Sequence, residues 1–358
     1  MRMHNFGAGP CALPLPVLEE VRDEFPEYDA AGMTVVEMSH RSSDYQAIHD
    51  RAKALVRSFS GAPDDFEILF IQGGATLQFS MVPLNFLGEG DSAAYVMSGA
   101  WGRKALADAE RLGGYSAWSG EPSGFTTMPG PGEVQVRPGT RYLHVTSNET
   151  IDGIRLMSLP GVDVPLVMDM SSDYLARPVE WERYDLVYGG VQKNLAPAGM
   201  ALVFVRRSAV EERTDLGTYL RYSTHVKGDS LANTPPMFQV YVMGKVLDHL
   251  QDRGGLGGLE ERTAAKAALV YDAIEQSSGF YRSPVDPRYR SHTNVVWRLP
   301  DEELEKLFVA EANQAGMIGL KGHRSVGGIR ASLYAATEIP SVEALVEFMA
   351  DFSARHRP

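Results

Sequence analysis

The sequence is nearly without cysteine, because Cys11 is the only one among its 358 residues. A single cysteine excludes an internal disulfide and a cysteine-based zinc cluster, so a reducing compartment is expected. The chain also lacks an apolar run long enough to span a bilayer, and its start shows no charged-then-apolar signal segment. We therefore expect a soluble, cytoplasmic protein.

Basic residues are also in short supply, with 34 Lys and Arg against 46 Asp and Glu, a formal net charge of -12. This charge argues against nucleic acid as a general partner, and an anionic substrate would need a local basic cluster. The hydrophobic content of 44% and charged content of 22% are ordinary for a globular protein. The length exceeds that of a typical single core and favours two domains.

Short apolar strands alternate with helical segments over most of the chain. This alternation predicts an α/β layer with a largely parallel sheet, in which ligands collect at the carboxyl ends of the strands. Strands are expected at 66–71, 92–97, 141–145, 164–168, 186–188 and 202–204, and helices at 16–24, 45–59, after residue 76 and at 101–110.

A glycine-rich joint at 250–258 separates this layer from the rest of the chain. Beyond it we expect an α+β domain, with helices at 259–276, 302–315 and 342–355 and strands at 294–297 and 328–333. The resulting division is an extended N-terminal arm (1–14), a large domain (15–250) and a small C-terminal domain (251–358).

Lys193 has an unusual setting for a lysine. It follows an apolar stretch that ends in Gly189-Gly190, and a second apolar run begins at Met200. This pattern predicts strand, tight turn and strand, with the lysine at the turn. A lysine between two buried strands is a candidate for a lowered pKa and for Schiff-base chemistry. The alternative is a hairpin lysine in solvent.

Asp169 ends a predicted strand, 24 residues before Lys193. That separation is one crossover unit, so the two strand ends can lie close together. A carboxylate can hold a protonated pyridine nitrogen and a lysine can form an imine with an aldehyde, which together are the protein side of pyridoxal 5'-phosphate (PLP) chemistry. The alternative for Asp169, which precedes Ser171-Ser172 closely, is a helix N-cap.

Three further segments follow predicted strands at the same edge. Gly73-Gly74-Ala75-Thr76 opens a helix, where backbone N–H groups favour a phosphate, although a plain strand-to-helix turn is the alternative. Trp101 could stack on a flat ring or pack in the core. The segment 147–153, Ser-Asn-Glu-Thr-Ile-Asp-Gly, is polar and turn-rich, and capping is its alternative role.

Two basic groups complete the candidate site. The first group is His40-Arg41. The second group begins with Lys321-Gly-His323-Arg324 and ends at Arg330, which lies in an apolar strand. Arginine binds carboxylate and phosphate in bidentate fashion, so these groups suggest a dianionic substrate. A solvated basic face is the alternative for His40-Arg41.

These residues, in this order, resemble the phosphoserine aminotransferases, a class V family of fold-type I PLP-dependent enzymes. The resemblance covers nearly the whole chain and is carried by 5–10, 39–41, 72–79, 147–153, 192–194, 233–236 and 321–332. It implies a large domain with a mostly parallel seven-stranded sheet, PLP as cofactor and a homodimer with active sites at the subunit interface.

The resemblance also implies a role for each matching residue. Lys193 would be the Schiff-base lysine and proton carrier, and Asp169 the partner of the pyridine nitrogen. The cofactor would further contact Trp101 (stacking on its ring), Thr150 (near its ring oxygen), Ala75, Thr76 and Gln192 (at its phosphate), and Asn233 and Thr234 (at the phosphate of the neighbouring subunit). Arg330 would bind the α-carboxylate of the substrate, and its distal anion would meet His40, Arg41, His323 and Arg324.

The implied reaction exchanges an amino group between glutamate and 3-phosphohydroxypyruvate, giving O-phospho-L-serine and 2-oxoglutarate in serine biosynthesis. It leaves open whether phosphorylated hydroxythreonine of vitamin B6 synthesis is a second substrate. Ala8 and Thr76 depart from family members that have serine and arginine there. The alternatives are another class V aminotransferase, such as the alanine–glyoxylate type, a catalytically silent scaffold, and a dehydrogenase, which lacks a clear dinucleotide motif here.

Overall fold

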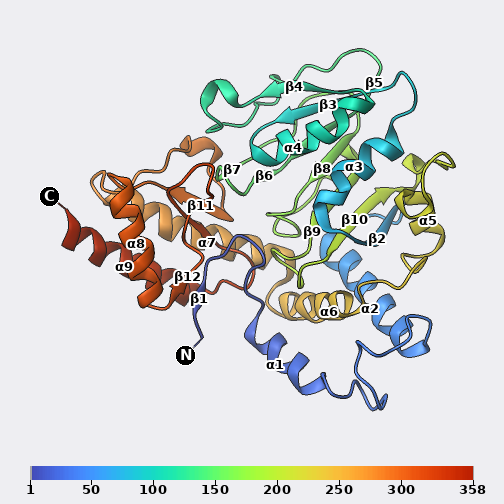
Figure 1. Cartoon of the computed structure of the whole chain (residues 1–358), viewed down its shortest axis with the longest axis horizontal. Helices are drawn as coiled ribbons and strands as arrows, with labels where there is room; N and C mark the ends of the chain where they lie inside the picture. Colours follow the sequence, from blue (N-terminus) through green and yellow to red (C-terminus); the bar gives the residue numbers. More distant parts are fainter. Residues whose placement is uncertain (1, 358) are drawn as a thin grey trace.

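A seven-stranded sheet forms the centre of the computed structural model, which describes residues 2–357 (Figure 1). The strand order is β2-β10-β9-β8-β5-β3-β4, in which β10 is antiparallel to both neighbours and every other pair is parallel. The predicted mostly parallel sheet is therefore confirmed. Its strands are Phe66–Gln72 (β2), Ser92–Met97 (β3), Gly114–Ser119 (β4), Thr140–Thr146 (β5), Leu166–Asp169 (β8), Tyr184–Gly190 (β9) and Met200–Arg206 (β10).

Helices cover both faces of the sheet, which explains why its strands are continuous apolar runs. Successive residues of a strand point to opposite faces, so Phe70 joins one buried cluster and Ile71 another. The cluster of Phe70 includes Ser43–Ser60 (α2) and Met237–Asp252 (α6), and that of Ile71 includes Gly74–Phe86 (α3), Ala100–Ala109 (α4) and Tyr222–Lys227 (α5). The helices α5 and α6 and the edge strand β4 are additions to the sequence-based prediction.

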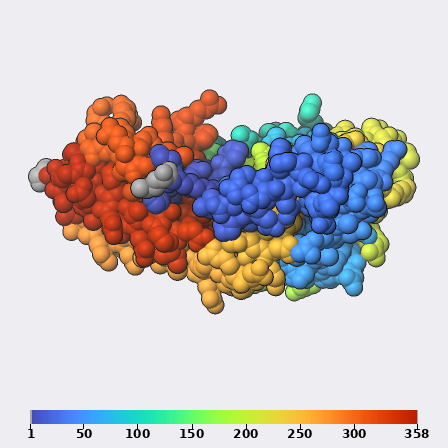
Figure 2. Space-filling view, turned by 90° about the horizontal axis from the view of Figure 1, so that it is seen from below, coloured from blue at the N-terminus to red at the C-terminus, as the bar shows by residue number. Residues whose placement is uncertain are grey.

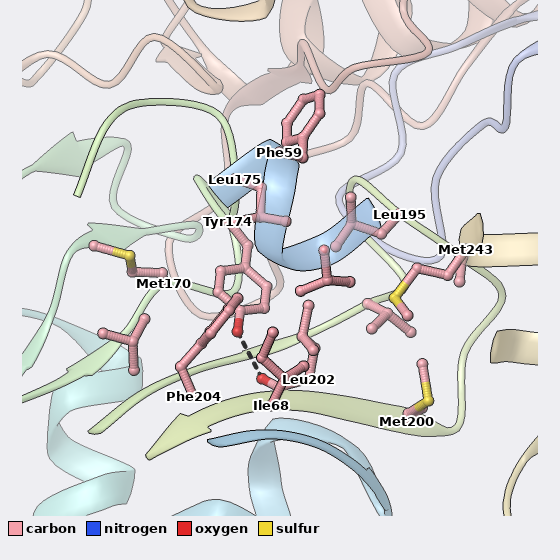
Figure 3. Close-up of a cluster of buried hydrophobic side chains, with 14 of the residues drawn as sticks. Phe59, Ile68, Met170, Tyr174, Leu175, Leu195, Met200, Leu202, Phe204 and Met243 are labelled. Carbon is pink, nitrogen blue, oxygen red and sulfur yellow. Dashed lines mark hydrogen bonds between the residues drawn. The ribbon is translucent and has the colours of Figure 1, made fainter. Parts of the chain in front are cut away.

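Packing of Tyr174 against β9 and β10 holds the loop that follows β8. Figure 3 shows Tyr174 of this loop among buried side chains, with its hydroxyl donating to the carbonyl oxygen of Leu202 at 2.8 Å. A β-carbon on Gly189 would lie 2.4 Å from Cδ1 of Tyr174. This close approach requires glycine at position 189, because any other residue would displace the Tyr174 ring.

The C-terminal part of the chain has its own buried cluster, which includes Trp297, Phe308 and Phe352. Its elements are Gly255–Gln276 (α7), Asn294–Trp297 (β11), Glu302–Gln314 (α8), Met317–Ile318 (β12), Ile329–Ser332 (β13) and Ile339–His356 (α9). The predicted helices and longer strands are present. Because α6 ends at Asp252 and α7 begins at Gly255, the glycine-rich joint is shorter than expected. The division of the chain at residue 250 stays a prediction.

The N-terminal arm joins the two parts. Its strand β1 (His4–Asn5) pairs in parallel with β12, and Phe6 belongs to the C-terminal cluster. Farther along, the backbone N–H of Cys11 donates to the carbonyl of Gln192 at 3.1 Å, and the Cys11 thiol donates to the carbonyl of Lys193. In Figure 2 this blue segment, with α1 (Leu15–Glu24), runs from the red C-terminal part across to the large part.

No helix within residues 2–357 combines the length and the apolar character needed to cross a membrane.

Candidate active site

A cavity of about 530 Å³ opens where the carboxyl ends of the central strands meet the small C-terminal part. Its position is the one expected for a ligand site in a parallel sheet. Of the fourteen residues predicted to contact cofactor or substrate, nine line it: Ala75, Thr76, Trp101, Thr150, Asp169, Gln192, Lys193, His323 and Arg330. The sequence order of these residues spans more than 250 positions, so the fold alone brings them together.

Lys193 lies in a loop, 191–199, between β9 and β10, and this loop is longer than the predicted tight turn. The carbonyl of Val191 accepts hydrogen bonds from the N–H groups of Leu195 and Ala196, both at 3.0 Å, which coils the loop. The Lys193 side chain is 8% exposed, so the alternative of a solvated hairpin lysine is wrong.

Burial shifts Lys193 towards the neutral amine, against the effect of nearby carboxylates. Its Nζ donates to Oγ1 of Thr150 at 2.7 Å. Burial lowers the pKa of Lys193 from 10.5 to about 8, while the nearby Asp169 and Glu149 carboxylates act in the opposite direction. An amine with this pKa is partly deprotonated near neutral pH and can accept a proton.

Asp169 is the last residue of β8 and is 3% exposed. Its Oδ1 accepts hydrogen bonds from the backbone N–H of Ser171 at 2.8 Å and from the Ser171 hydroxyl at 2.6 Å. Residues 171–175 form turns, so the expected alternative of a helix N-cap is wrong. Burial raises the pKa of Asp169, and the Ser171 hydrogen bonds and the Lys193 charge oppose that rise.

The turn from β2 into α3 presents uncapped backbone to the cavity. Gly73 and Gly74 have φ angles of 96° and 65°, which glycine adopts without strain. No side chain caps the start of α3, and its first turn contains no acidic residue. These backbone N–H groups, beside Ala75 and Thr76, are a suitable site for a phosphate.

Trp101 is the second residue of α4, and its ring faces the same cavity. The Nζ of Lys193 lies 5.7 Å from the centroid of this ring. The indole is therefore next to the amine, and it also packs against the edge of the buried cluster that contains Ile71. A flat ligand attached at Lys193 could stack against it.

Arg330 on β13 brings positive charge to the cavity from the C-terminal part. The side chain is 9% exposed, and its Nη1 donates to the carbonyl of Thr150 at 3.1 Å. Its Nε has no hydrogen-bond partner within residues 2–357, and no carboxylate of these residues forms an ion pair with it. This guanidinium is consequently available to an anion. His323 also lines the cavity, and its Nδ1 lies 2.7 Å from Oγ of Ser325.

Five residues of the predicted site do not line the cavity: His40, Arg41, Asn233, Thr234 and Arg324. Nδ2 of Asn233 donates to Oε1 of Gln72 at 2.9 Å, and Oγ1 of Thr234 lies 3.4 Å from Nδ1 of His40. These three residues thus gather beside the end of β2. Arg41 and Arg324 are exposed. Their roles in ligand binding stay predictions.

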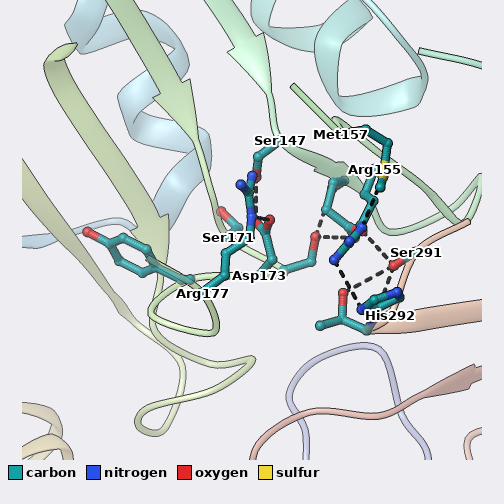
Figure 4. Close-up of polar contacts among 12 residues, drawn as sticks. Ser147, Arg155, Met157, Ser171, Asp173, Arg177, Ser291 and His292 are labelled. Carbon is teal, nitrogen blue, oxygen red and sulfur yellow. Dashed lines mark hydrogen bonds and ion pairs between the residues drawn. The ribbon is translucent and has the colours of Figure 1, made fainter. Parts of the chain in front are cut away.

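A buried polar network lies behind the cavity (Figure 4). Asp173 accepts hydrogen bonds from the Ser147 hydroxyl and, at 2.9 Å, from Nε of Arg177. Nδ2 of Asn148 donates to Oγ of Ser172 and to Oδ1 of Asn294, both at 2.8 Å. The network ties the turn that carries Thr150 to the loop that follows Asp169. Asp173 and Arg177 were not predicted from the sequence, although the polar run after Asp169 was a signal for them.

The sequence matches the family described as Aminotransferase class-V over residues 3–345. The chain therefore belongs to the class V aminotransferases, which excludes the dehydrogenase alternative. Among curated relatives, the phosphoserine aminotransferase of Niallia circulans is 50% identical over 98% of both chains, and that of Bacillus subtilis (strain 168) is 46% identical over 98% of both. The predicted resemblance to phosphoserine aminotransferases is confirmed.

Solved structures agree with this assignment. Phosphoserine aminotransferase from Bacillus circulans subsp. alkalophilus has a TM-score of 0.98 at 49% identity, covering 99% of both chains. PLP-bound phosphoserine aminotransferase from Trichomonas vaginalis has a TM-score of 0.93 at 33% identity, covering 98% of this chain and 100% of the other. An alanine–glyoxylate aminotransferase from Nostoc sp., at 17% identity and a TM-score of 0.73, shares the fold.

Proposed function

We propose that this protein is a PLP-dependent phosphoserine transaminase. It would move an amino group reversibly between glutamate and 3-phosphohydroxypyruvate, giving O-phospho-L-serine and 2-oxoglutarate, a step of serine biosynthesis. The observation that carries the proposal is one cavity that holds a buried amine, Lys193, a buried carboxylate, Asp169, and an unpaired guanidinium, Arg330. The names of the relatives that cover the whole chain support the same reaction.

The residues around the cavity fit PLP. The uncapped start of α3 suits its phosphate, Asp169 suits its ring nitrogen, and the amine of Lys193 suits its aldehyde. The ring of Trp101 would cover one face of the pyridine, and Thr150 would lie near its ring oxygen. Ala75, Thr76 and Gln192 would hold the phosphate, joined by Asn233 and Thr234 of a second subunit.

When bound, PLP supplies an aldehyde that exchanges between amines and a conjugated ring that takes up the electrons of the α-carbon–hydrogen bond. Lys193 would move the α-proton, which requires its amine to be neutral. A pKa lowered to about 8 leaves a fraction of the amine neutral near neutral pH, and that fraction grows as the pH rises. Asp169 would remain ionised opposite the ring nitrogen, helped by the two hydrogen bonds from Ser171.

The cationic groups would select substrates with two anions. Arg330 would bind the α-carboxylate, which glutamate and phosphoserine share, because its Nε is free to donate. His323, with Arg324, would take the distal carboxylate or phosphate. His40 and Arg41 would reach that distal anion from the second subunit of a homodimer, because they do not line the cavity of their own chain.

The remaining parts of the proposal concern organisation. We retain the arm at 1–14, the large domain at 15–250 and the small domain at 251–358, because most of the buried residues beyond 250 form a cluster of their own, although Leu259, Val285, Val296 and Ala335 join the cluster of the large part. The cytoplasm remains the proposed location, supported by the single cysteine.

Substitution of Lys193 tests the proposed function directly. The purified parent protein should be yellow, and glutamate should change its absorbance spectrum. Lys193→Ala should lose that visible absorbance and nearly all turnover, because no other amine of the cavity could bond the aldehyde. Lys306→Ala, which removes a lysine whose side chain is 68% exposed on α8, is the matched control.

The choice of amino acceptor distinguishes a phosphoserine transaminase from an aminotransferase of the alanine–glyoxylate type. Phosphohydroxypyruvate should be a far better amino acceptor than glyoxylate, since only phosphohydroxypyruvate has a distal anion for His323 and Arg324 to bind. A preference for glyoxylate would support the alanine–glyoxylate type, and a colourless parent protein without transaminase activity would support the silent scaffold.

A further inference from the structure

Glu149 contacts the start of the helix that carries the tryptophan of the proposed site, yet it does not line the cavity. Its side chain is fully buried, with 0% exposure. Oε2 accepts a hydrogen bond from the backbone N–H of Trp101 at 3.0 Å, and Oε1 accepts from the N–H of Gly102 at 2.9 Å and from the Ser98 hydroxyl at 3.0 Å. The carboxylate therefore holds the first turn of α4 by its backbone.

The backbone of α4 is fitted closely to this carboxylate. A β-carbon on Gly99 would lie 2.7 Å from Cδ of Glu149 and 2.4 Å from Oδ2 of Asp152. A β-carbon on Gly102 would lie 2.7 Å from the carbonyl of Val96. Glycine at position 99 thus lets the start of α4 approach Glu149, and glycine at position 102 lets it approach the end of β3. This close fit of the first turn of α4 leaves the backbone that carries the Trp101 indole little freedom to shift.

We propose that Glu149 is a positioning residue, which holds the ring of Trp101 against the cofactor by anchoring the first turn of α4. The inference rests on the proposed function, because the ring that Trp101 would cover belongs to PLP. Glu149 itself would touch neither cofactor nor substrate. It is the only side chain of residues 2–357 that accepts hydrogen bonds from the N–H groups of both Trp101 and Gly102.

The anchor would depend on pH. Burial, followed by the Asp152 charge, raises the pKa of Glu149 to about 7. The charged groups that face the carboxylates of Glu149 and Asp152 are Arg103 on α4, Arg330 on β13 and Lys193 after β9. The ionised form can accept at both oxygens, whereas a protonated carboxyl turns one of them into a donor. As the pH falls through about 7, the hold on Trp101 should weaken.

The substitution Glu149→Gln should remove the hydrogen bond to the backbone N–H of Trp101 and keep the other two. The amide has one accepting oxygen, which would stay with Ser98 and Gly102, the two donors of Oε1. Its NH₂ group would then face the N–H of Trp101, donor against donor. The matched control is Glu110→Gln, since Glu110 is exposed just beyond the other end of α4.

Fluorescence of the cofactor-free protein provides a readout that does not depend on activity. The signal of Trp101 is the difference between the parent and Trp101→Phe, because three other tryptophans are present. The proteins of this series carry Lys193→Met, because the Lys193 amine, with a pKa of about 8, lies 5.7 Å from the ring centroid and would itself alter the signal. In this background the difference should titrate with a midpoint near pH 7 in the parent of the series and in the control Glu110→Gln, and the transition should vanish in Glu149→Gln. A transition that persists in Glu149→Gln, or its absence from the parent, would overturn the proposal.

Cofactor affinity tests the coupling between the two residues. Glu149→Gln should weaken PLP binding about threefold to tenfold, the range that aromatic stacking contributes. In a Trp101→Ala background the same substitution should have less than about a twofold effect, because nothing is left to position. Equal effects in both backgrounds would contradict a role through Trp101.

The parent titration also covers the case in which Glu149→Gln does not fold, since it needs no change at Glu149. Failure of the proposed function has a different signature. The parent would then bind no PLP, while the fluorescence of the cofactor-free protein would still report whether Glu149 controls Trp101.

Discussion

Replacement of Lys193 by methionine in the cofactor-free protein should make its stability less dependent on pH. Burial lowers the pKa of Lys193 in the folded protein from 10.5 to about 8. Between these two values the unfolded chain holds a proton that the folded chain has released. The free energy of unfolding of the parent therefore rises with pH through this window, and the methionine variant lacks that contribution.

The magnitude follows from the size of the pKa shift. Each unit corresponds to about 1.4 kcal/mol, so a shift from 10.5 to about 8 amounts to about 3 kcal/mol. The variant should be the more stable protein at about pH 7, and its advantage should shrink by about 3 kcal/mol when the pH exceeds 10.5. Lys266, whose pKa burial lowers to about 7, titrates in both proteins and cancels in the difference.

Urea unfolding of the two cofactor-free proteins at a series of pH values, at one protein concentration, measures this difference. Lys306→Met on α8 serves as the control for loss of a surface lysine. If the unfolding free energies of the parent and of Lys193→Met run parallel from neutral to alkaline pH, the amine is not desolvated as the structure indicates. The proposed ability of Lys193 to act as a base near neutral pH would then lose its physical basis.

Two further substitutions probe the anion-binding groups and the network behind the cavity. Arg330→Ala should raise the KM values of both glutamate and the phosphorylated substrate, whereas Arg324→Ala should affect the phosphorylated substrate more; equal effects of Arg324→Ala on both would refute this division. Asp173→Ala should lower the free energy of unfolding by about 3 kcal/mol, because it leaves the largely buried Arg177 without its ion pair. A loss below about 1 kcal/mol in urea unfolding would show that water replaces the carboxylate.

The central sheet was predictable because its strands are buried on both faces. Runs such as Phe66–Gln72 carry a strong apolar signal that does not depend on the rest of the fold. The two-residue strands β1 and β12 carry no such signal, since they exist only because distant segments meet. The edge strand β4 is only half-buried, and its residues alternate too weakly to be recognised.

The candidate site divides along similar lines. Lys193 and Asp169 stood out because charged residues at the ends of apolar runs are unusual. Glu149 was part of a quoted motif, but its role depends on hydrogen bonds to the backbone of α4, which no residue pattern encodes. The tight turn expected around Lys193 was wrong because backbone hydrogen bonds from Leu195 and Ala196 to the carbonyl of Val191 coil residues 191–199 into a longer loop.

The pairing of β1 with β12 has a consequence for the order of events during synthesis. His4 is synthesised well before its partner Met317, which lies more than 300 residues later in the chain. Until then the arm has no strand to join, and Phe6 has no core to enter. Contacts of such long sequence separation form late in folding. The backbone of Lys193, which the same arm holds through Cys11, should accordingly reach its final position only after the segment around Met317 has been made.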